Sequence, residues 1–200
     1  MSSSEPIAIV GLGGILPGAA TLDDFWNVVE EGVDTASEPP EGRWHLDLDK
    51  AYDPERARAD HVYSKRACFI RDFELDPAGL DLPTELLDAL DPMVHLALHA
   101  GRQAWQDAVT DPLDPGRVGV MLGNLVLPTV SASAMADWIL GRRFEREVFR
   151  AAGVPMPPEN REPVGAVNRW VAGLPAAVLA RGLRLGGDRF CLDAACSSSL

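Results

Sequence analysis

The residues best suited to chemistry are the last cysteines of the sequence, in the stretch RFCLDAACSSSL. Cys196 follows an apolar run that predicts a strand and precedes small residues that suit a tight turn and a helix start. A cysteine at such a turn lies at the positive end of a helix dipole, which favours the nucleophilic thiolate. Its small neighbours would let a bulky acyl thioester reach the sulfur. The pattern indicates a nucleophile, although a small, buried and inert cysteine fits the same residues.

Other residues of chemical interest have simpler interpretations. His95 and His99 are spaced to place two metal ligands on one helix face, but the stretch HLALH lacks the glutamate of the H-E-x-x-H motif. No third ligand with convincing spacing follows, so we predict structural roles for both histidines and no metal site. Cys68 and Cys191 lie among apolar neighbours, and we predict small buried thiols at both positions.

A glycine loop near the start, Gly11-x-Gly13, resembles the opening of a dinucleotide-binding turn. The third glycine of G-x-G-x-x-G would fall at Leu16, which a proline follows, and this suits neither close approach to a phosphate nor a helix start. We therefore predict a structural turn and no tightly bound cofactor.

Alternating strands and helices must position these residues. An apolar run at 7–10 predicts a strand, and a helix with a threonine N-cap should cover about 21–32. Residues 33–75 predict a long ordered loop region with short strands near Tyr63 and Phe69.

The rest of the chain continues this alternation. The predicted elements are helices at 84–90, at 91–109 with Asp91 as N-cap, at 131–153 with a break near Gly141 and at 165–185, and strands at 117–124 and 188–196. Strands that alternate with helices favour an α/β layered fold with a largely parallel sheet.

Composition excludes several classes of protein. The 200 residues are 46% hydrophobic and 24% charged, as in an ordinary globular protein. A net charge of −12 argues against nucleic-acid binding. No apolar run is long enough to span a membrane. We expect a short disordered tail at 1–4 rather than a signal peptide, and a reducing cytoplasm for three cysteines without an export signal.

Three stretches together resemble one known family. DAACSSSL resembles the active-site signature D-T-A-C-S-S-S-L of β-ketoacyl synthases, members of the thiolase-like superfamily. EPIAIVGLGGILPGAATLDDFWNVVEEG resembles the start of the same domain, and LLDALDPMVHLALHAGRQAWQDA followed by RVGVMLGN resembles its M-D-P-Q helix and the next strand. The resemblance implies the N-terminal half of an αβαβα ketosynthase over residues 5–200, from a type I polyketide synthase or a polyunsaturated-fatty-acid-synthase-like enzyme.

The family also implies a reaction and its partners. Cys196 would be the acyl-accepting nucleophile, with its backbone N–H forming part of an oxyanion hole. The reaction would be the decarboxylative Claisen condensation of an acyl thioester with a malonyl-type thioester, both carried on the phosphopantetheine of an acyl carrier protein. The complete enzyme would be a homodimer and an acyltransferase without a tightly bound cofactor.

The sequence departs from the family pattern in several places. Gly14 stands where many relatives have cysteine, Ala194 replaces the usual threonine, and His95 lies where Q-Q-R is usual. The stretches SKRACFIRDFELDPAGLDLP and GVMLGNLVLPTVSASAMADWIL look more like iterative synthases of polyunsaturated fatty acids and glycolipid-type chains than modular antibiotic synthases.

The largest departure concerns the catalytic partners of the cysteine. The two catalytic histidines and a lysine of the family follow the cysteine, whereas all four histidines here precede it. We therefore expect an incomplete domain, cut after its nucleophile and inactive in isolation. Two alternatives are one half of a split ketosynthase and a non-catalytic interaction or dimerisation module.

Overall fold

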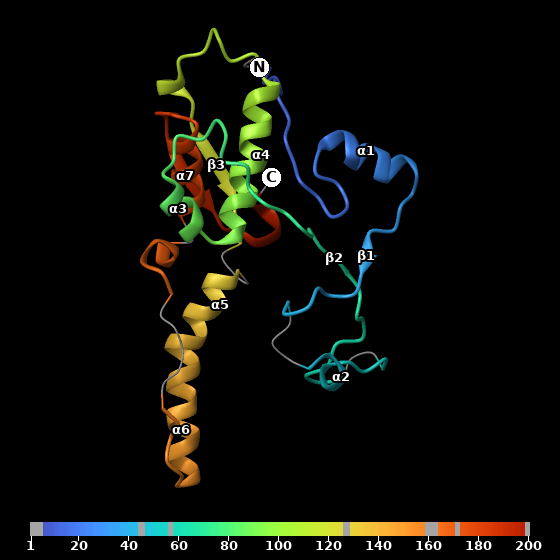
Figure 1. The fold of residues 1–200 in the computed structure, drawn as a ribbon, viewed down its shortest axis with the longest axis vertical. Coiled ribbons are helices and arrows are strands. Elements are labelled where there is room, and N and C mark those ends of the chain that lie inside the picture. Colours follow the sequence, from blue (N-terminus) through green and yellow to red (C-terminus); the bar gives the residue numbers. More distant parts are fainter. Residues whose placement is uncertain are drawn as a thin grey trace, which may run out of the picture. The chain divides into compact units, whose positions relative to one another are not determined.

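The computed structural model describes residues 6–43, 47–55, 58–125, 129–158, 164–170 and 173–198. The chain divides into two compact units (Figure 1). Unit 1 comprises the residues up to Glu74 together with Gln103–Ala108, and unit 2 comprises Leu75–Arg102 and the residues from Val109 onward. The tail predicted at 1–4 lies outside the described residues. Within the described residues, no helix combines the length and the apolar character needed to cross a membrane.

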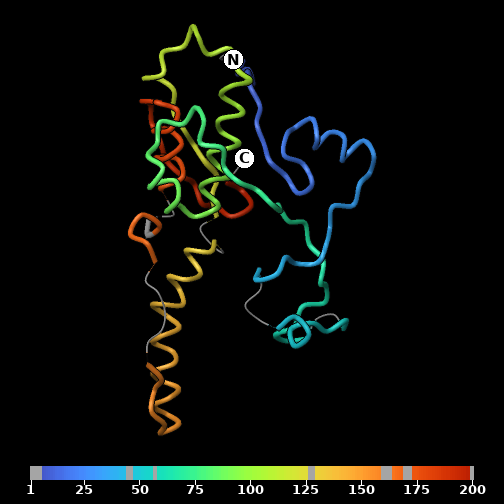
Figure 2. The backbone as a smooth tube through the Cα atoms, in the orientation of Figure 1, coloured from blue at the N-terminus to red at the C-terminus, as the bar shows by residue number. Residues whose placement is uncertain are grey.

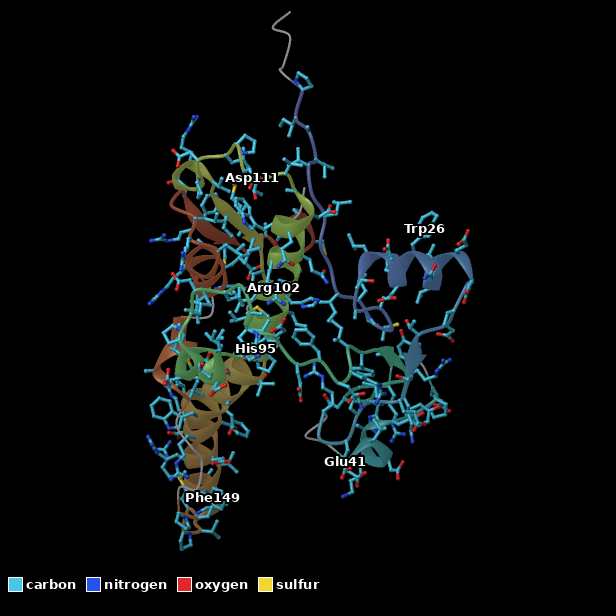
Figure 3. All side chains as sticks on the ribbon, turned by 45° about the horizontal axis from the view of Figure 1, so that its top comes forward. Trp26, Glu41, His95, Arg102, Asp111 and Phe149 are labelled. Carbon is cyan, nitrogen blue, oxygen red and sulfur yellow. The ribbon has the colours of Figure 1, made fainter. Side chains whose placement is uncertain are left out.

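Helix α1 (Leu22–Glu30) begins where the sequence predicts it. The Thr21 hydroxyl accepts the Asp24 N–H at 3.1 Å, and the Asp24 carboxylate accepts the Thr21 N–H at 3.1 Å, which completes a capping box. Gly32 follows the end of the helix with a φ of 63°, a left-handed conformation that glycine adopts easily. The helix buries none of its residues, and the Trp26 side chain points outward with 63% of its surface exposed (Figure 3).

The strand predicted at 7–10 is not formed. Ile7 and Ile9 are 98% and 82% exposed, and no described strand pairs with this segment. An apolar run becomes a strand only where a neighbouring strand satisfies its backbone hydrogen bonds, and this segment has no such neighbour among the described residues.

The loop after this segment bonds to the end of helix α4 (Pro92–Asp107). The Leu12 N–H donates to the Asp107 carboxylate, and the Gly14 N–H donates to the side-chain oxygen of Gln103, each at 2.9 Å. Side chains therefore satisfy backbone groups here that a sheet would otherwise satisfy.

The long loop region of unit 1 contains a minimal antiparallel pair, β1 (Ala36–Ser37) with β2 (Ala67–Cys68). β2 adjoins one of the two positions where short strands were predicted. Near the other position, Tyr63, the chain forms one isolated bridge between Tyr52 and Val62. The prediction of a long ordered loop with short strands is thus confirmed in outline.

Charged side chains support this region. Helix α2 (Leu48–Ala51) begins after Asp47, whose carboxylate caps it. The Arg66 guanidinium donates to the Asp34 carboxylate at 2.9 Å and to the Ala36 carbonyl at 2.5 Å, which ties β2 to β1. Most of these groups are exposed, so the stabilisation per contact is small.

Unit 2 begins with the predicted pair of helices, α3 (Thr84–Ala89) and α4. Asp91 caps α4, since its carboxylate accepts the Met93 N–H at 2.9 Å. Val94 and Leu98 on α4 are completely buried. These two positions of α4 therefore face the core of unit 2.

Arg102 on α4 is buried, and its charge is satisfied by backbone groups. The guanidinium donates to the carbonyls of Asp76 and Ala78, each at 2.5 Å, and the Asp76 carboxylate lies 3.8 Å away. Figure 3 labels this side chain. The aliphatic stem of the arginine thus occupies a core position while its head remains fully bonded.

A parallel pair of strands forms the centre of unit 2. The short helix η1 (Pro115–Arg117) leads into β3 (Val120–Gly123), which pairs in parallel with β4 (Arg189–Leu192). Both strands lie inside their predicted ranges. Helix α7 (Leu174–Gly182) packs against both strands. The buried residues of α7 are Pro175, Ala176, Val178, Leu179, Ala180 and Gly182.

The predicted helix at 131–153 is one continuous helical rod (Figure 2). It consists of α5 (Val130–Ala136), the π-helical turn η2 (Asp137–Gly141) and α6 (Arg142–Ala152). The predicted break is therefore a local widening of the helix that ends at the glycine, and the helix continues beyond it. The short helix η3 (Ala166–Trp170) precedes α7, and both lie within the stretch 165–185 that was predicted to be helical.

Candidate active site

Cys196 lies at the carboxyl edge of the parallel strands. β4 ends at Leu192, and three residues connect it to the cysteine. β3 and β4 run in the same direction, so their carboxyl ends lie at the same edge. The Asn124 N–H donates to the Leu192 carbonyl at 2.9 Å and extends the pairing beyond both strands. In open α/β sheets, this edge is where ligands bind.

The cysteine occupies the short turn η4 (Ala195–Ser197). Ala195 has a φ of 49°, in the left-handed region that residues with a side chain rarely adopt. The residue before it, Ala194, has a φ of −125° and a ψ of 33°, and Ser198 after the turn has right-handed helical angles. The Cys196 side chain is exposed, so a thioester can reach the sulfur. Of the two alternatives left open by the sequence, a buried position is not what the structure shows, and the role of Cys196 as a nucleophile stays a prediction.

Two side chains fix the backbone around this turn. The Ser198 hydroxyl accepts the Ala194 N–H at 2.8 Å and donates to the Ala195 carbonyl at 2.9 Å. The Asp193 carboxylate accepts the Ala195 N–H at 3.3 Å. The conformation of Ala195 is therefore held from both sides by hydrogen bonds.

Gly123, the last residue of β3, lets the turn approach the sheet closely. A Cβ at this position would lie 3.0 Å from the carbonyl oxygen of Ser198 and 3.1 Å from its Cβ. Backbone cannot move aside cheaply at such a distance, so a residue with a side chain would displace the turn.

The backbone N–H groups of the turn are used unequally. Those of Ala194 and Ala195 bond to side chains, and those of Ser197 and Ser198 donate to the carbonyls of Ala194 and Ala195 at 3.0 and 3.3 Å. The N–H of Cys196 makes no hydrogen bond to any described residue. A donor of this kind, next to an exposed sulfur, is the arrangement needed to stabilise an oxyanion formed on the thioester.

The other two cysteines have different surroundings. Cys191 is half-buried on β4, opposite Leu122. Cys68 was predicted to be buried, and this is wrong: it is exposed on β2, where its sulfur accepts the Thr35 hydroxyl at 3.6 Å. Both residues of β2 are exposed because a two-residue strand pair covers little surface.

The described histidines make local structural contacts. A ring nitrogen of His95 lies 2.8 Å from the Leu87 carbonyl, and one of His61 lies 2.7 Å from the Ala59 carbonyl. Within the described part of the chain, no three His, Cys, Asp or Glu side chains gather closely enough to hold a metal ion.

The glycine loop near the start has a packing role, in agreement with the sequence analysis. A Cβ on Gly11 would lie 2.4 Å from the Ala104 carbonyl oxygen and 2.9 Å from the Ala108 Cβ. Gly11 is therefore required for the chain to pass against the last turns of α4 within unit 1.

Comparison with known families identifies the family of this chain. The model of the family "Beta-ketoacyl synthase, N-terminal domain" matches residues 4–200. The chain belongs to the β-ketoacyl synthase family, a family of condensing enzymes. The resemblance stated from the sequence is confirmed.

Individual relatives give the same result. The chain is 31% identical to a phenolphthiocerol/phthiocerol polyketide synthase of Mycobacterium tuberculosis over 202 residues, which is 98% of this chain and 10% of that protein. It is 30% identical to a polyunsaturated fatty acid synthase of Thraustochytrium sp. over 119 residues, 58% of this chain and 4% of that protein. This chain thus spans a small part of the curated relatives that it matches.

Solved structures agree on the fold. The PfaC Keto synthase-Chain length factor matches with a TM-score of 0.78 and 30% identity, over 96% of this chain and 21% of that one. A ketosynthase from module 6 of the bacillaene synthase of Bacillus subtilis matches with a TM-score of 0.57 and 25% identity, over 96% and 27%. The predicted thiolase-like α/β fold is confirmed.

The sequence predicts Cys196 as the nucleophile, which stays a prediction, but it did not reveal the residues that shape the turn of Cys196. Asp193 and Ser198 were seen as part of the signature, but no role was predicted for either, and the importance of Gly123 was not recognised. The available signals were a glycine at the end of a predicted strand and a serine two residues after the cysteine. Neither signal can be interpreted until β3 and β4 are known to be neighbours.

Proposed function

We propose that this chain is the N-terminal half of a ketosynthase domain and supplies its acyl-accepting nucleophile, Cys196. The observation that carries the proposal is the exposed cysteine of the DAACSSSL motif, whose own N–H makes no hydrogen bond to a described residue. The substrates are an acyl thioester and a malonyl-type thioester, both on the phosphopantetheine of an acyl carrier protein.

The first step is acyl transfer. The Cys196 thiolate attacks the carbonyl carbon of the acyl thioester, and the oxyanion that forms accepts a hydrogen bond from the Cys196 N–H. The intermediate collapses with loss of the phosphopantetheine thiolate, which takes up a proton. The product is an acyl-cysteine thioester.

The second step is condensation. The malonyl thioester loses CO₂, and the resulting enolate carbon attacks the acyl-cysteine carbonyl. The cysteine thiolate leaves, and the product is a β-ketoacyl thioester two carbons longer. We assign the acid–base work of this step to the two histidines and the lysine that the family places after the cysteine, because all four histidines of this chain precede it and His61 and His95 bond to nearby backbone carbonyls.

Several finer statements belong to the same proposal. We expect an acyltransferase of the 3-oxoacyl-[acyl-carrier-protein] synthase type, homodimeric when complete and without a tightly bound cofactor. Its closer likeness to iterative synthases of long chains, its cytoplasmic location and its extent as one domain over 5–200 stay predictions. The accessible cysteine favours an enzyme over a non-catalytic interaction module.

Acyl loading tests the proposal directly. The full-length polypeptide is incubated with a hexanoyl-pantetheine thioester, and acylation of each cysteine is followed by peptide mass spectrometry. Cys68 is the matched control, because it is also exposed but lies on the strand β2 and not in a turn after a parallel strand. We expect Cys196 to acylate at least about tenfold faster than Cys68. Equal rates would show that Cys196 is not the nucleophile.

A second measurement addresses the isolated chain. We expect residues 1–200 alone to release no CO₂ from malonyl-pantetheine, because decarboxylation needs the histidines assigned above to the rest of the family domain. The full-length polypeptide, assayed in parallel, should release CO₂ when loaded with an acyl group. Release by the isolated chain at a comparable rate would contradict the assignment of the acid–base residues.

A further inference from the structure

We propose that Ser198 is a positioning residue for acyl transfer to Cys196. Its hydroxyl holds the turn in the shape that keeps the Cys196 N–H and sulfur in a fixed relation. This inference rests on the proposed function and names a further residue of the same site.

The hydrogen bonds of Ser198 enclose the one strained residue of the turn. Its hydroxyl accepts the N–H of Ala194 and donates to the carbonyl of Ala195, at 2.8 and 2.9 Å. Ala195, with a φ of 49°, lies between these two bonds. A left-handed alanine persists only where its surroundings hold it there, and a hydroxyl that is both donor and acceptor can do so from two sides.

The sheet in turn fixes the position of Ser198. Its carbonyl oxygen and Cβ would lie 3.0 and 3.1 Å from a Cβ placed on Gly123, so the serine backbone rests directly on the end of β3. We call the two hydrogen bonds of the Ser198 hydroxyl the Ser198 clamp. Because Ser198 rests on β3, the clamp holds the cysteine turn in a fixed position relative to this strand.

The Ser198 clamp also affects which backbone N–H of the turn is left to donate a hydrogen bond to the substrate. The Ser198 hydroxyl accepts the N–H of Ala194, and the Asp193 carboxylate accepts that of Ala195. The N–H groups of the two residues after Cys196 donate to carbonyls of the turn. Among the five residues from 194 to 198, the Cys196 N–H is the one without a hydrogen bond to a described residue. Loss of the clamp would let the turn relax and reorient this donor.

This geometry predicts a split between two reactions of the same sulfur. Acyl transfer from a thioester requires the sulfur and the N–H together, because an oxyanion develops as the sulfur attacks. Alkylation by iodoacetamide requires only an accessible thiolate. A positioning defect should therefore slow acylation and spare alkylation, whereas general disorder of the turn would change both.

The test compares three variants in the full-length polypeptide. Ser198→Ala removes the hydroxyl, and Ser198→Thr restores it. Ser197→Ala is the matched control from the same serine run, since the structure gives the exposed Ser197 side chain no hydrogen bond to a described residue. Rates of hexanoyl transfer from hexanoyl-pantetheine and of iodoacetamide alkylation are measured at Cys196 by peptide mass spectrometry.

We expect Ser198→Ala to lower acylation about tenfold while alkylation stays within about twofold. Ser198→Thr should recover most of the acylation rate, and Ser197→Ala should match the wild type. Unchanged acylation in Ser198→Ala, equal losses in both reactions or an equal loss in Ser197→Ala would each overturn the inference. Failure of wild-type Cys196 to acylate faster than Cys68 would instead overturn the proposed function, and this inference with it.

Discussion

The two compact units are stabilised in different ways. Among the described residues, the buried apolar side chains of unit 1 are Ala19 and Ala51, both small. Unit 2 buries larger ones on several elements, including Val94 and Leu98 on α4 and Leu179 on α7. Unit 1 relies on a capping box, turns and exposed ion pairs, which contribute little individually, whereas unit 2 has a packed core.

The proposed nucleophile lies in the unit with the packed core. The turn of Cys196 rests on the end of β3, and β3 and β4 pack against α7. A catalytic geometry must be held to within a fraction of an ångström, and packed strands hold it better than loops do. The cysteine turn, with its left-handed Ala195, is thus supported by the packed core of unit 2.

The largest expected effect is a loss of core packing in unit 2. Leu98→Ala removes a completely buried side chain and should lower the free energy of opening of α4 by about 3 kcal/mol. Leu12→Ala is the matched control in unit 1, where the Leu12 side chain is 58% exposed. This substitution should change the free energy of local opening in unit 1 by about 0.5 kcal/mol or less. Amide hydrogen exchange measures both. Similar losses would mean that unit 1 depends on apolar burial after all.

The next effect tests how closely α4 and α7 pack within unit 2. A Cβ on Gly101 would lie 2.5 Å from the Leu179 Cδ2, and the buried Leu179 has little room to turn away. Gly101→Ala should therefore destabilise the pair by about 2 kcal/mol, despite the better helix propensity of alanine. Gly173→Ala, where nothing lies within 4 Å of the new Cβ, should change stability by about 0.5 kcal/mol or less. A stabilised Gly101→Ala variant would show that the helices are further apart.

The same contrast explains how far the sequence could predict the structure. Local signals were sufficient where a helix has a cap and an apolar stripe, as at Thr21 and Asp91, and where a strand ends in glycine, as at Gly123. They failed at 7–10, because a strand depends on a partner that periodicity does not reveal. They also failed at Arg102, whose burial depends on carbonyls of a distant loop.

The candidate site, too, could be predicted from the sequence only in part. The residue type and its small neighbours indicated the nucleophile, and the family signature agreed. The support of the turn could not be predicted, because the contact between Gly123 and Ser198 joins two strands far apart in the sequence. The left-handed conformation of Ala195 was equally invisible, since alanine carries no preference for it.

A smaller effect is expected from the cap of α1 in unit 1. Thr21→Ala removes the acceptor for the Asp24 N–H and leaves half of the capping box, so α1 should lose about 1 kcal/mol of local stability. Thr21→Ser keeps the hydroxyl and should retain most of that stability. Hydrogen exchange of the α1 amides reports the change. An unchanged α1 in Thr21→Ala would mean that contacts other than its cap hold the helix.

The smallest effect concerns an exposed carboxylate beside β1. The pKa of Asp34 is lowered from 3.8, first by the hydrogen bond from the Ala36 N–H and then by the Arg66 guanidinium. A lowered pKa in the folded state means that the carboxylate stabilises unit 1 above pH 3.8, and that this contribution is lost as the pH falls through the folded-state value. Acid should therefore loosen β1 and β2.

Arg66→Gln separates the two causes. The pKa of Asp34, followed by NMR titration of its carboxyl carbon, should rise only part of the way to 3.8, because the larger cause, the Ala36 N–H, remains. Arg71→Gln is the control, since Arg71 bonds to Ser37 and the Glu38 carbonyl instead. A full return to 3.8 in Arg66→Gln would mean that the Ala36 hydrogen bond depends on the arginine. In that case, the order of β1 in unit 1 would rest on one exposed ion pair.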